Sequence, residues 1–386
     1  MSHSVYFVGA GLSRALQRDK PVPLLADFIK IAAHYAENDE SNIILTTLIG
    51  LETCDTFQWK SEVCSKLAKL IEPEHRKPID LAAFLRALRR RPSESIEDLL
   101  GRHTGTKVDR IFGDPPVRFR YAISRLFTLI GWDVDLKLLE EFVRLRLKRA
   151  PGRHSFVSFN YDLFLDRAIA QSVPAWHWHC GYGIRVPYFI ARDPVNPYPV
   201  VSPPACGHCC QSDVRVLKPH GSLNWLLPVV RPARAMPFGD GPVVVRVDTT
   251  GAPEYVATAR DWLRLFYTAN GMPKKVAPGI IAPLRRKEAH LPIFSETREA
   301  EIAAIKDARE VFVLGWSMPA TDDDQRCLIR RAADLRAEPP HQLVVVNLNQ
   351  PPEYFERVAD TFGVPLSAVQ VWNHGVADYV RAECVG

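Results

Sequence analysis

Val5-Tyr-Phe-Val-Gly-Ala-Gly-Leu-Ser-Arg-Ala-Leu16 is the stretch that decides the fold. An apolar run leads directly into two glycines and a serine, which predicts a strand over about residues 5–8, a tight turn and then a helix. Glycines at such a turn let backbone N–H groups approach a nucleotide phosphate, and the helix start favours its negative charge. Arg14 stands where the third glycine of a dinucleotide fingerprint would fall, so a tight turn without a ligand remains an alternative.

Composition indicates a folded globular protein. The chain has 386 residues, of which 47% are hydrophobic and 24% charged, enough for two domains or for one large α/β domain with insertions. No apolar run is long enough to span a membrane and no basic, apolar leader is present, so we expect a cytoplasmic protein without membrane contact. The net charge of +5 is modest and the arginines are scattered, so direct nucleic-acid binding is not indicated.

Helical periodicity dominates residues 20–150, which we interpret as a mainly helical insertion after the first βα unit. Apolar residues recur at helical spacing in three segments, namely Leu81 to Leu88, Phe119 to Ile130 and Leu136 to Leu147. Residues 173–213 form a Pro-, aromatic- and Cys-rich excursion too irregular to assign, and residues 226–275 contain a candidate hairpin around Gly239-Asp-Gly241.

Strand patterns return after the helical insertion. Ser155 to Phe159 and Val214 to Leu217 are the first two, and the runs 279–282, 311–314 and 343–346 then alternate with helical segments. Such alternation is typical of parallel strands joined by crossover helices. The sequence therefore predicts one Rossmann-like α/β sheet that contains both ends of the chain, so that residues 1–386 form a single α/β domain with insertions.

Polar clusters follow the predicted strands, where an open parallel sheet binds its ligand. They are Gly9-Ala10-Gly11-Leu12-Ser13, Asn160-Tyr-Asp162, His220-Gly-Ser222, Gly315-Trp-Ser317 and Asn347. Turn chemistry explains any one of them. Five at equivalent topological positions indicate a common site.

The segments Gly-Ala-Gly-Leu-Ser, Phe-Asn-Tyr-Asp, His-Gly-Ser-Leu-Asn-Trp and Leu-Gly-Trp-Ser-Met-Pro-Ala-Thr-Asp, in this order, resemble the sirtuin-like NAD-hydrolase family, and more specifically its bacterial antiviral-defence branch. Ser95-Ile-Glu-Asp-Leu-Leu100 is also similar to that branch. The resemblance implies a Rossmann-like fold and cleavage of the bond between nicotinamide and ribose in NAD.

The same resemblance implies a role for each matching residue. Gly9, Ala10, Gly11 and Ser13 would surround the NAD phosphates, and Gly315, Ser317 and Asn347 would hold the adenosine half. Asn160 would orient the nicotinamide ribose and the attacking water, with Asp162 supporting the nicotinamide end. His220 would bind the ribose hydroxyls and act as the base.

These residue types suit the reaction. Cleavage expels neutral nicotinamide and leaves positive charge on the ribose, so positioning groups and a nearby proton acceptor matter more than a strong nucleophile. An imidazole with an ordinary pKa of about 6.5 accepts a proton near neutral pH. The alternative for His220 is a loop histidine bonded to a backbone carbonyl.

Departures from the deacylating sirtuins separate the candidate functions. The chain lacks their Gly-Ile-Pro-Asp-Phe-Arg segment after the glycine loop and has Phe159 where they carry glutamine. We therefore expect an NAD glycohydrolase that depletes NAD in antiviral defence, with an NAD-dependent protein deacylase and a non-catalytic NAD or ADP-ribose binding module as alternatives. Control of such an enzyme implies a homo-oligomer and a separately encoded activator or ATPase partner.

Cysteines offer a further candidate site. Cys206 and Cys209 have C-x-x-C spacing, and Cys180 follows two histidines, so together they could form a structural zinc site. The second C-x-x-C pair is missing, and reduced thiols in a folded loop are the alternative.

Overall fold

A computed structural model gives the fold and describes residues 2–16, 28–38, 44, 48, 86–87, 89–90, 115–130, 135–178, 180–184, 188–191, 200–202, 212–228, 243–245, 276–280, 292–319 and 322–385. The chain divides into two compact units. The first consists of Met1–Lys20, Gly131–Ile281 and Glu288–Gly386, and the second of Pro21–Ile130 and Ala282–Lys287.

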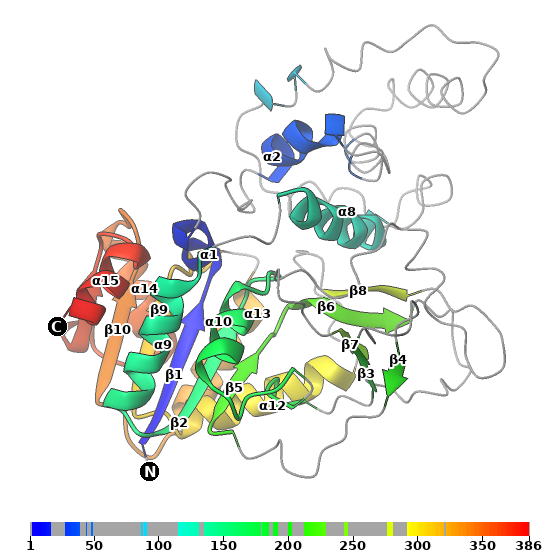
Figure 1. Cartoon of the computed structure of the whole chain (residues 1–386). Coiled ribbons are helices and arrows are strands. Elements are labelled where there is room, and N and C mark those ends of the chain that lie inside the picture. Colours follow the sequence, from blue (N-terminus) through cyan, green and yellow to red (C-terminus); the bar gives the residue numbers. More distant parts are fainter. Residues whose placement is uncertain are drawn as a thin grey trace, which may run out of the picture. The chain divides into compact units, whose positions relative to one another are not determined.

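The first unit contains a six-stranded sheet in which every pairing is parallel (Figure 1). Its strands are β1 (Ser2–Val8), β2 (Gly152–Ser158), β5 (Val214–Leu217), β9 (Glu310–Leu314), β10 (Gln342–Val346) and β11 (Val369–Trp372). They lie in the order β11-β10-β9-β1-β2-β5, which is the doubly wound Rossmann order and reverses direction between β1 and β9. The predicted Rossmann-like α/β class is confirmed.

Helices cover both faces of this sheet, because side chains alternate along each strand. Tyr6 and Val8 belong to a core shared with α9 (Lys137–Arg149), α10 (Phe164–Ser172) and α15 (Val376–Val385). Val5 and Phe7 belong to a second core shared with α12 (Pro292–Lys306), α13 (Asp323–Asp334) and α14 (Pro352–Phe362). Burial of β1 on both faces explains its continuous apolar run.

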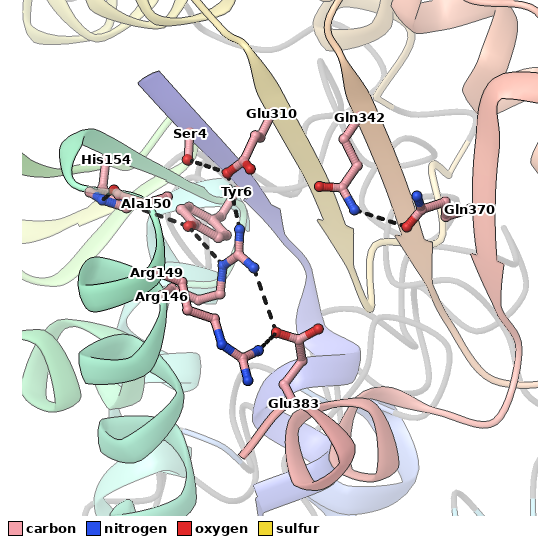
Figure 2. A network of polar contacts seen from close by, with 10 residues as sticks. All are labelled: Ser4, Tyr6, Arg146, Arg149, Ala150, His154, Glu310, Gln342, Gln370 and Glu383. Carbon is pink, nitrogen blue, oxygen red and sulfur yellow. Dashed lines mark hydrogen bonds and ion pairs between the residues drawn. The ribbon is translucent and has the colours of Figure 1, made fainter. Parts of the chain in front are cut away.

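A buried arginine of α9 ties helices to the amino-terminal half of the sheet (Figure 2). Arg146 Nη2 donates to Glu310 Oε2 at 3.0 Å, and its Nη1 lies 3.5 Å from Glu383 Oε2 on α15. Ser4 Oγ donates to the same Glu310 oxygen at 2.7 Å, and the guanidinium lies over the Phe312 ring at 4.2 Å. This cluster stabilises the fold at the end of β1 and β9 remote from the predicted site.

His3 begins the buried part of β1 and should make the fold sensitive to acid. Burial lowers the pKa of its imidazole to about 4, and the Arg153 guanidinium pushes it the same way. The ordinary pKa of histidine is 6.5, so His3 of the unfolded chain binds a proton below about that pH. His3 of the folded chain does not bind this proton until the pH falls to about 4. Stability is therefore lost as the pH falls through this window, by roughly 2 kcal/mol between pH 7 and pH 5.

His3→Gln should flatten that dependence in urea unfolding followed at pH 7 and pH 5. His34→Gln, which changes an exposed histidine of α2, serves as the matched control and should leave the slope as it is. An unchanged slope in His3→Gln would remove His3 as the source of acid sensitivity.

A second sheet of five strands follows β5, in the order β4-β3-β7-β6-β8. Its members are β3 (Tyr188–Ala191), β4 (Val200–Ser202), β6 (Gly221–Pro228), β7 (Val243–Val245) and β8 (Val276–Ile280). β6 and β7 pair antiparallel, as a hairpin would, although the turn around Gly239 lies outside the described residues. The excursion at 173–213 contributes β3 and β4 to this sheet.

The prediction that residues 279–282 belong to a parallel strand of the main sheet is wrong. Their described part ends β8, which pairs antiparallel with β6 through Gly221 and Ile280. Gly221 has φ +80°, and a Cβ there would lie 1.9 Å from the carbonyl oxygen of Gly279. This glycine turns the chain out of the main sheet after β5, so β8 pairs with β6 and the main sheet ends at β5.

The second unit is helical where it is described. It contains α2 (Phe28–Tyr35), η1 (Ala36–Asn38) and α8 (Pro115–Ile130), and Phe28 packs on Phe119 with ring centroids 5.1 Å apart. Arg89 donates to the carbonyl oxygen of Ala33 and pairs with Glu37 at 2.9 Å. α9, which we assigned to the insertion, belongs to the first unit. No helix among the described residues is long and apolar enough to cross a membrane.

Candidate active site

The site residues follow strands that end in register. Val8 of β1 pairs with Leu314 of β9, which pairs with Val346 of β10. Gly9, Gly315 and Asn347 are the next residues along each strand, so they occupy equivalent places on both sides of the point where the strand order reverses. In a doubly wound sheet this is where the ligand crevice forms.

The glycine turn packs against the turn after β9. Gly9 N donates to Leu314 O and Gly11 N donates to Gly315 O, each at 3.0 Å. A Cβ on Gly9 would lie 2.4 Å from Trp316 Cα, and one on Gly11 would lie 2.9 Å from Gly315 Cα. Both glycines are therefore required for close packing of two backbones, and both amides already donate to protein carbonyls. Ala10 opens α1 (Ala10–Leu16), which also carries Ser13.

A chain of buried hydrogen bonds links α1 to the turn after β2. Asn160 Nδ2 donates to Gly9 O at 3.0 Å and to Ser13 Oγ at 2.8 Å. Ser13 Oγ in turn donates to Asp162 Oδ2 at 2.7 Å. Three residues that the sequence placed at the site are therefore linked by hydrogen bonds. Ser13 lies on α1, whereas Asn160 and Asp162 lie in the segment after β2, and Ser13 and Asn160 are 147 positions apart in the sequence.

Asn160 also carries an atom with no partner. Its side chain is 7% exposed, and Oδ1 accepts no hydrogen bond from the described residues. A buried carbonyl oxygen without a donor is unfavourable by about 1–3 kcal/mol. The amide nitrogen is fixed by two acceptors, so the orientation of the oxygen is fixed as well.

Asp162 is oriented by the protein. Its Oδ1 accepts from Phe164 N at 3.2 Å, while Ser13 engages the other oxygen. Burial raises the pKa of the Asp162 carboxyl, and the Lys218 ammonium opposes this rise. The side chain therefore serves as a fixed acceptor for Ser13, which in turn supports Asn160.

A buried ion pair lies directly behind this turn. Lys218 Nζ donates to the backbone carbonyl of Asp162 at 2.7 Å and to Asp166 Oδ2 at 3.2 Å, and both side chains of the pair are fully buried. Lys218 follows β5 and Asp166 lies on α10, so the pair joins the segment that leads to His220 to the helix that follows the Asn160 turn. Neither residue was predicted from the sequence, where a lysine directly after the short strand Val214–Leu217 was the available signal.

His220 stands three residues beyond Leu217, and Leu217 pairs with Val157, which precedes Asn160 by three residues. Phe159 and Tyr161, the two neighbours of Asn160, both contact the His220 ring, at centroid distances of 5.4 Å and 6.5 Å. His220 Nε2 lies 3.5 Å from Asp322 Oδ1. The imidazole is therefore a side-chain partner of a carboxylate at the same sheet edge as Asn160.

The residues expected at the adenosine half are brought together only in part. Gly315, with φ +64°, and Asn347 are buried, and Asn347 Nδ2 donates to Trp316 O at 3.2 Å. Ser317 is exposed. Trp316 and Trp225 are 2% and 0% exposed and belong to the cores.

The zinc prediction stays a prediction. Cys180 is a partly exposed thiol whose Sγ lies 4.0 Å from His177 O. Cys206 and Cys209 lie outside the described residues. Within the part of the chain that the structure describes, no group of three or more His, Cys, Asp and Glu side chains is arranged to hold a metal ion.

Fold and site together define an α/β protein of the doubly wound class with a buried amide and an imidazole at its switch point. No protein-family model and no curated protein matches the chain. Among solved structures, one titled as Sir2 in complex with the inhibitor EX-527, 2'-O-acetyl-ADP-ribose and deacetylated p53 peptide matches at 14% identity, a TM-score of 0.36, and coverage of 71% of this chain and 81% of that one. A second, titled as the structural basis of sirtuin substrate affinity, matches at 13% identity, a TM-score of 0.39, and coverage of 99% and 92%. At these scores the strand order, rather than either likeness, carries the fold assignment.

Proposed function

We propose that the chain is an NAD glycohydrolase, which cleaves NAD with water to nicotinamide and ADP-ribose. The observation that carries the proposal is the convergence of Asn160 and His220: each lies three residues beyond paired positions of β2 and β5, and Phe159 and Tyr161 join them. The ordered motifs that resemble the sirtuin-like NAD-hydrolase family indicate NAD as the substrate.

Asn160 suits the ribose end of the reaction. Its free Oδ1 can accept a hydrogen bond from the attacking water or from a ribose hydroxyl, which orients that group without adding a charge. Ser13 and Asp162 hold the amide in place through the bonds described above. The resemblance to the sirtuin-like family is what assigns Asp162 to the support of the nicotinamide end.

His220 suits proton transfer. Loss of nicotinamide leaves positive charge on the ribose, and a base that takes a proton from water or from a ribose hydroxyl completes the hydrolysis. Asp322 lies close enough to favour the charged imidazolium that results. We assign the phosphates to Gly9, Ala10, Gly11 and Ser13, and the adenosine half to Gly315, Ser317 and Asn347. The amides of Gly9 and Gly11 already donate within the protein, so these two glycines would contribute the shape of the turn and not hydrogen bonds to the phosphates.

Product analysis tests this assignment. The purified chain, incubated with NAD alone and with an acylated lysine peptide, should release nicotinamide and ADP-ribose in equal amounts whether or not the peptide is present. Release that requires the peptide and yields an acyl ADP-ribose would instead establish a deacylase. Thermal stabilisation by NAD or ADP-ribose with no turnover, also in the presence of candidate activators, would establish a binding module.

A cellular role follows from the reaction. An enzyme that consumes NAD without a second substrate depletes a shared cofactor, which suits a cytoplasmic effector of antiviral defence. Such an enzyme must stay inactive until triggered, and we infer control by homo-oligomerisation or by a separately encoded activator or ATPase partner. Size-exclusion chromatography with light scattering, with and without NAD, measures the oligomeric part of this inference.

A further inference from the structure

Asp322 holds a specific place between two loops of the site. It is the residue directly before α13, and its side chain is buried with 4% exposure. Its Oδ1 lies 3.5 Å from His220 Nε2, and its Oδ2 accepts a hydrogen bond from Trp316 Nε1 at 3.1 Å. Asp323 and Asp324, by contrast, lie in the exposed first turn of α13.

The indole that holds Asp322 cannot move freely. Trp316 stacks on Phe159 with ring centroids 4.3 Å apart and on Phe7 of β1 at 6.2 Å. Its side chain is buried in the core on that face of the sheet. The Asp322 carboxylate is therefore fixed by a donor that is itself fixed by the sheet, and Phe159 contacts the His220 ring as well.

Two charged side chains of the described segments after β2 and β5 bind other partners. Asp162 is engaged by Ser13 and by Phe164 N, and the Lys218 ammonium is bound to Asp166 and to the Asp162 carbonyl. Tyr161 faces the imidazole through its ring at 6.5 Å. Asp322 places a carboxylate oxygen at ion-pair distance from the imidazole, 3.5 Å from Nε2.

We propose that Asp322 is the positioning residue of His220, held in turn by Trp316, and that the pair acts as a carboxylate–imidazole dyad. The proposal rests on the proposed function and adds a residue to it. When His220 takes a proton from water or from a ribose hydroxyl, the imidazole becomes a cation, and the adjacent carboxylate stabilises that cation and keeps the ring at one angle. The proton later leaves to solvent, so no further reactant is needed.

Asp322→Asn tests the dyad, because it keeps the shape and removes the charge. We expect kcat for NAD hydrolysis to fall roughly 10- to 100-fold with KM little changed. The acidic limb of the pH–rate profile should move to lower pH by about one unit, because an opposite charge at this distance favours the protonated ring by about that much or more. Asp322→Glu, which keeps the charge and displaces it, should recover part of both.

Asp324→Asn is the matched control, since this carboxylate is two residues further along α13 and exposed. It should leave kcat, KM and the profile unchanged. An NMR titration of the His220 ring in the full chain, assigned with His220→Gln, provides a readout that needs no turnover, and Asp322→Asn should lower its midpoint by the same amount.

An unmoved His220 midpoint in folded Asp322→Asn would overturn the dyad, whatever the activity. Absence of NAD cleavage by the unmodified chain, together with a shifted midpoint, would reject the proposed reaction and keep the pairing. If Asp322→Asn does not fold, Trp316→Phe takes its place, because it keeps the ring stack and removes the N–H group that donates to Asp322. A lowered kcat at unchanged KM in this variant supports the dyad. An unchanged kcat overturns it.

Discussion

Asn160→Ala should lower kcat for NAD hydrolysis roughly 1,000-fold, the largest effect on activity that the site predicts. The variant removes the free Oδ1 that we assign to the water or ribose, and it also removes the two bonds to Gly9 O and Ser13 Oγ. His220→Ala should cause a loss of similar size, because the base is gone. Steady-state release of nicotinamide, measured by chromatography, reports both.

Asn373→Ala is a suitable control for lost hydrogen bonds. Asn373 follows β11 as Asn160 follows β2, and it makes two bonds to the backbone of Gln350, at 2.8 Å and 3.0 Å. It has no role in the proposed chemistry, so its removal should lower stability by about 1–3 kcal/mol and leave kcat unchanged. Normal hydrolysis by both Asn160→Ala and His220→Ala would reject the assignment of these residues.

Lys218→Met should lower the free energy of unfolding by about 3–5 kcal/mol, the largest effect on stability that we expect. Methionine fills a similar volume, but it leaves the Asp166 carboxylate buried without its cation and the Asp162 carbonyl without its donor. Urea unfolding followed by circular dichroism measures the loss. Activity should fall as well, because the turn that carries Asn160 loses its support.

The double variant Lys218→Met with Asp166→Asn separates charge from packing. Removing both charges leaves no uncompensated ion, so most of the lost stability should return, although the Asp162 carbonyl stays without a donor. A double variant as unstable as Lys218→Met alone would show that the ion pair is not what the single substitution disturbs.

The sheet was predictable because its strands are buried on both faces. Val5 to Val8, Val311 to Leu314 and Leu343 to Val346 are continuous apolar runs that end at polar or glycine residues, and the structure confirms all three as parallel strands. β11 was missed because it is an edge strand, where Gln370 and Val371 are exposed and the apolar run is broken. β3 and β4 of the second sheet were missed because they are only four and three residues long, whereas the candidate hairpin at residues 226–275 included the segment that forms β7.

The site was predictable to the extent that it follows strand ends. Asn160, Ser13 and Asp162 are joined by hydrogen bonds, as motifs at one sheet edge suggested, and His220 follows the neighbouring strand β5. The sequence could not identify Asp322 as the partner of His220, because the fold brings together two residues that are far apart in the sequence. The motif also did not predict why glycine is required at positions 9 and 11: there it allows the turn after β1 to pack closely against the turn after β9.

A crystal structure of Asn160→Ala with NAD bound tests the central claim most directly, because the slow variant should retain the substrate. The account predicts that the nicotinamide ribose lies beside position 160 and His220, with the adenosine half toward Gly315 and Asn347. NAD bound elsewhere on the chain, or a ribose more than a hydrogen bond away from the His220 ring with no water between them, would contradict it.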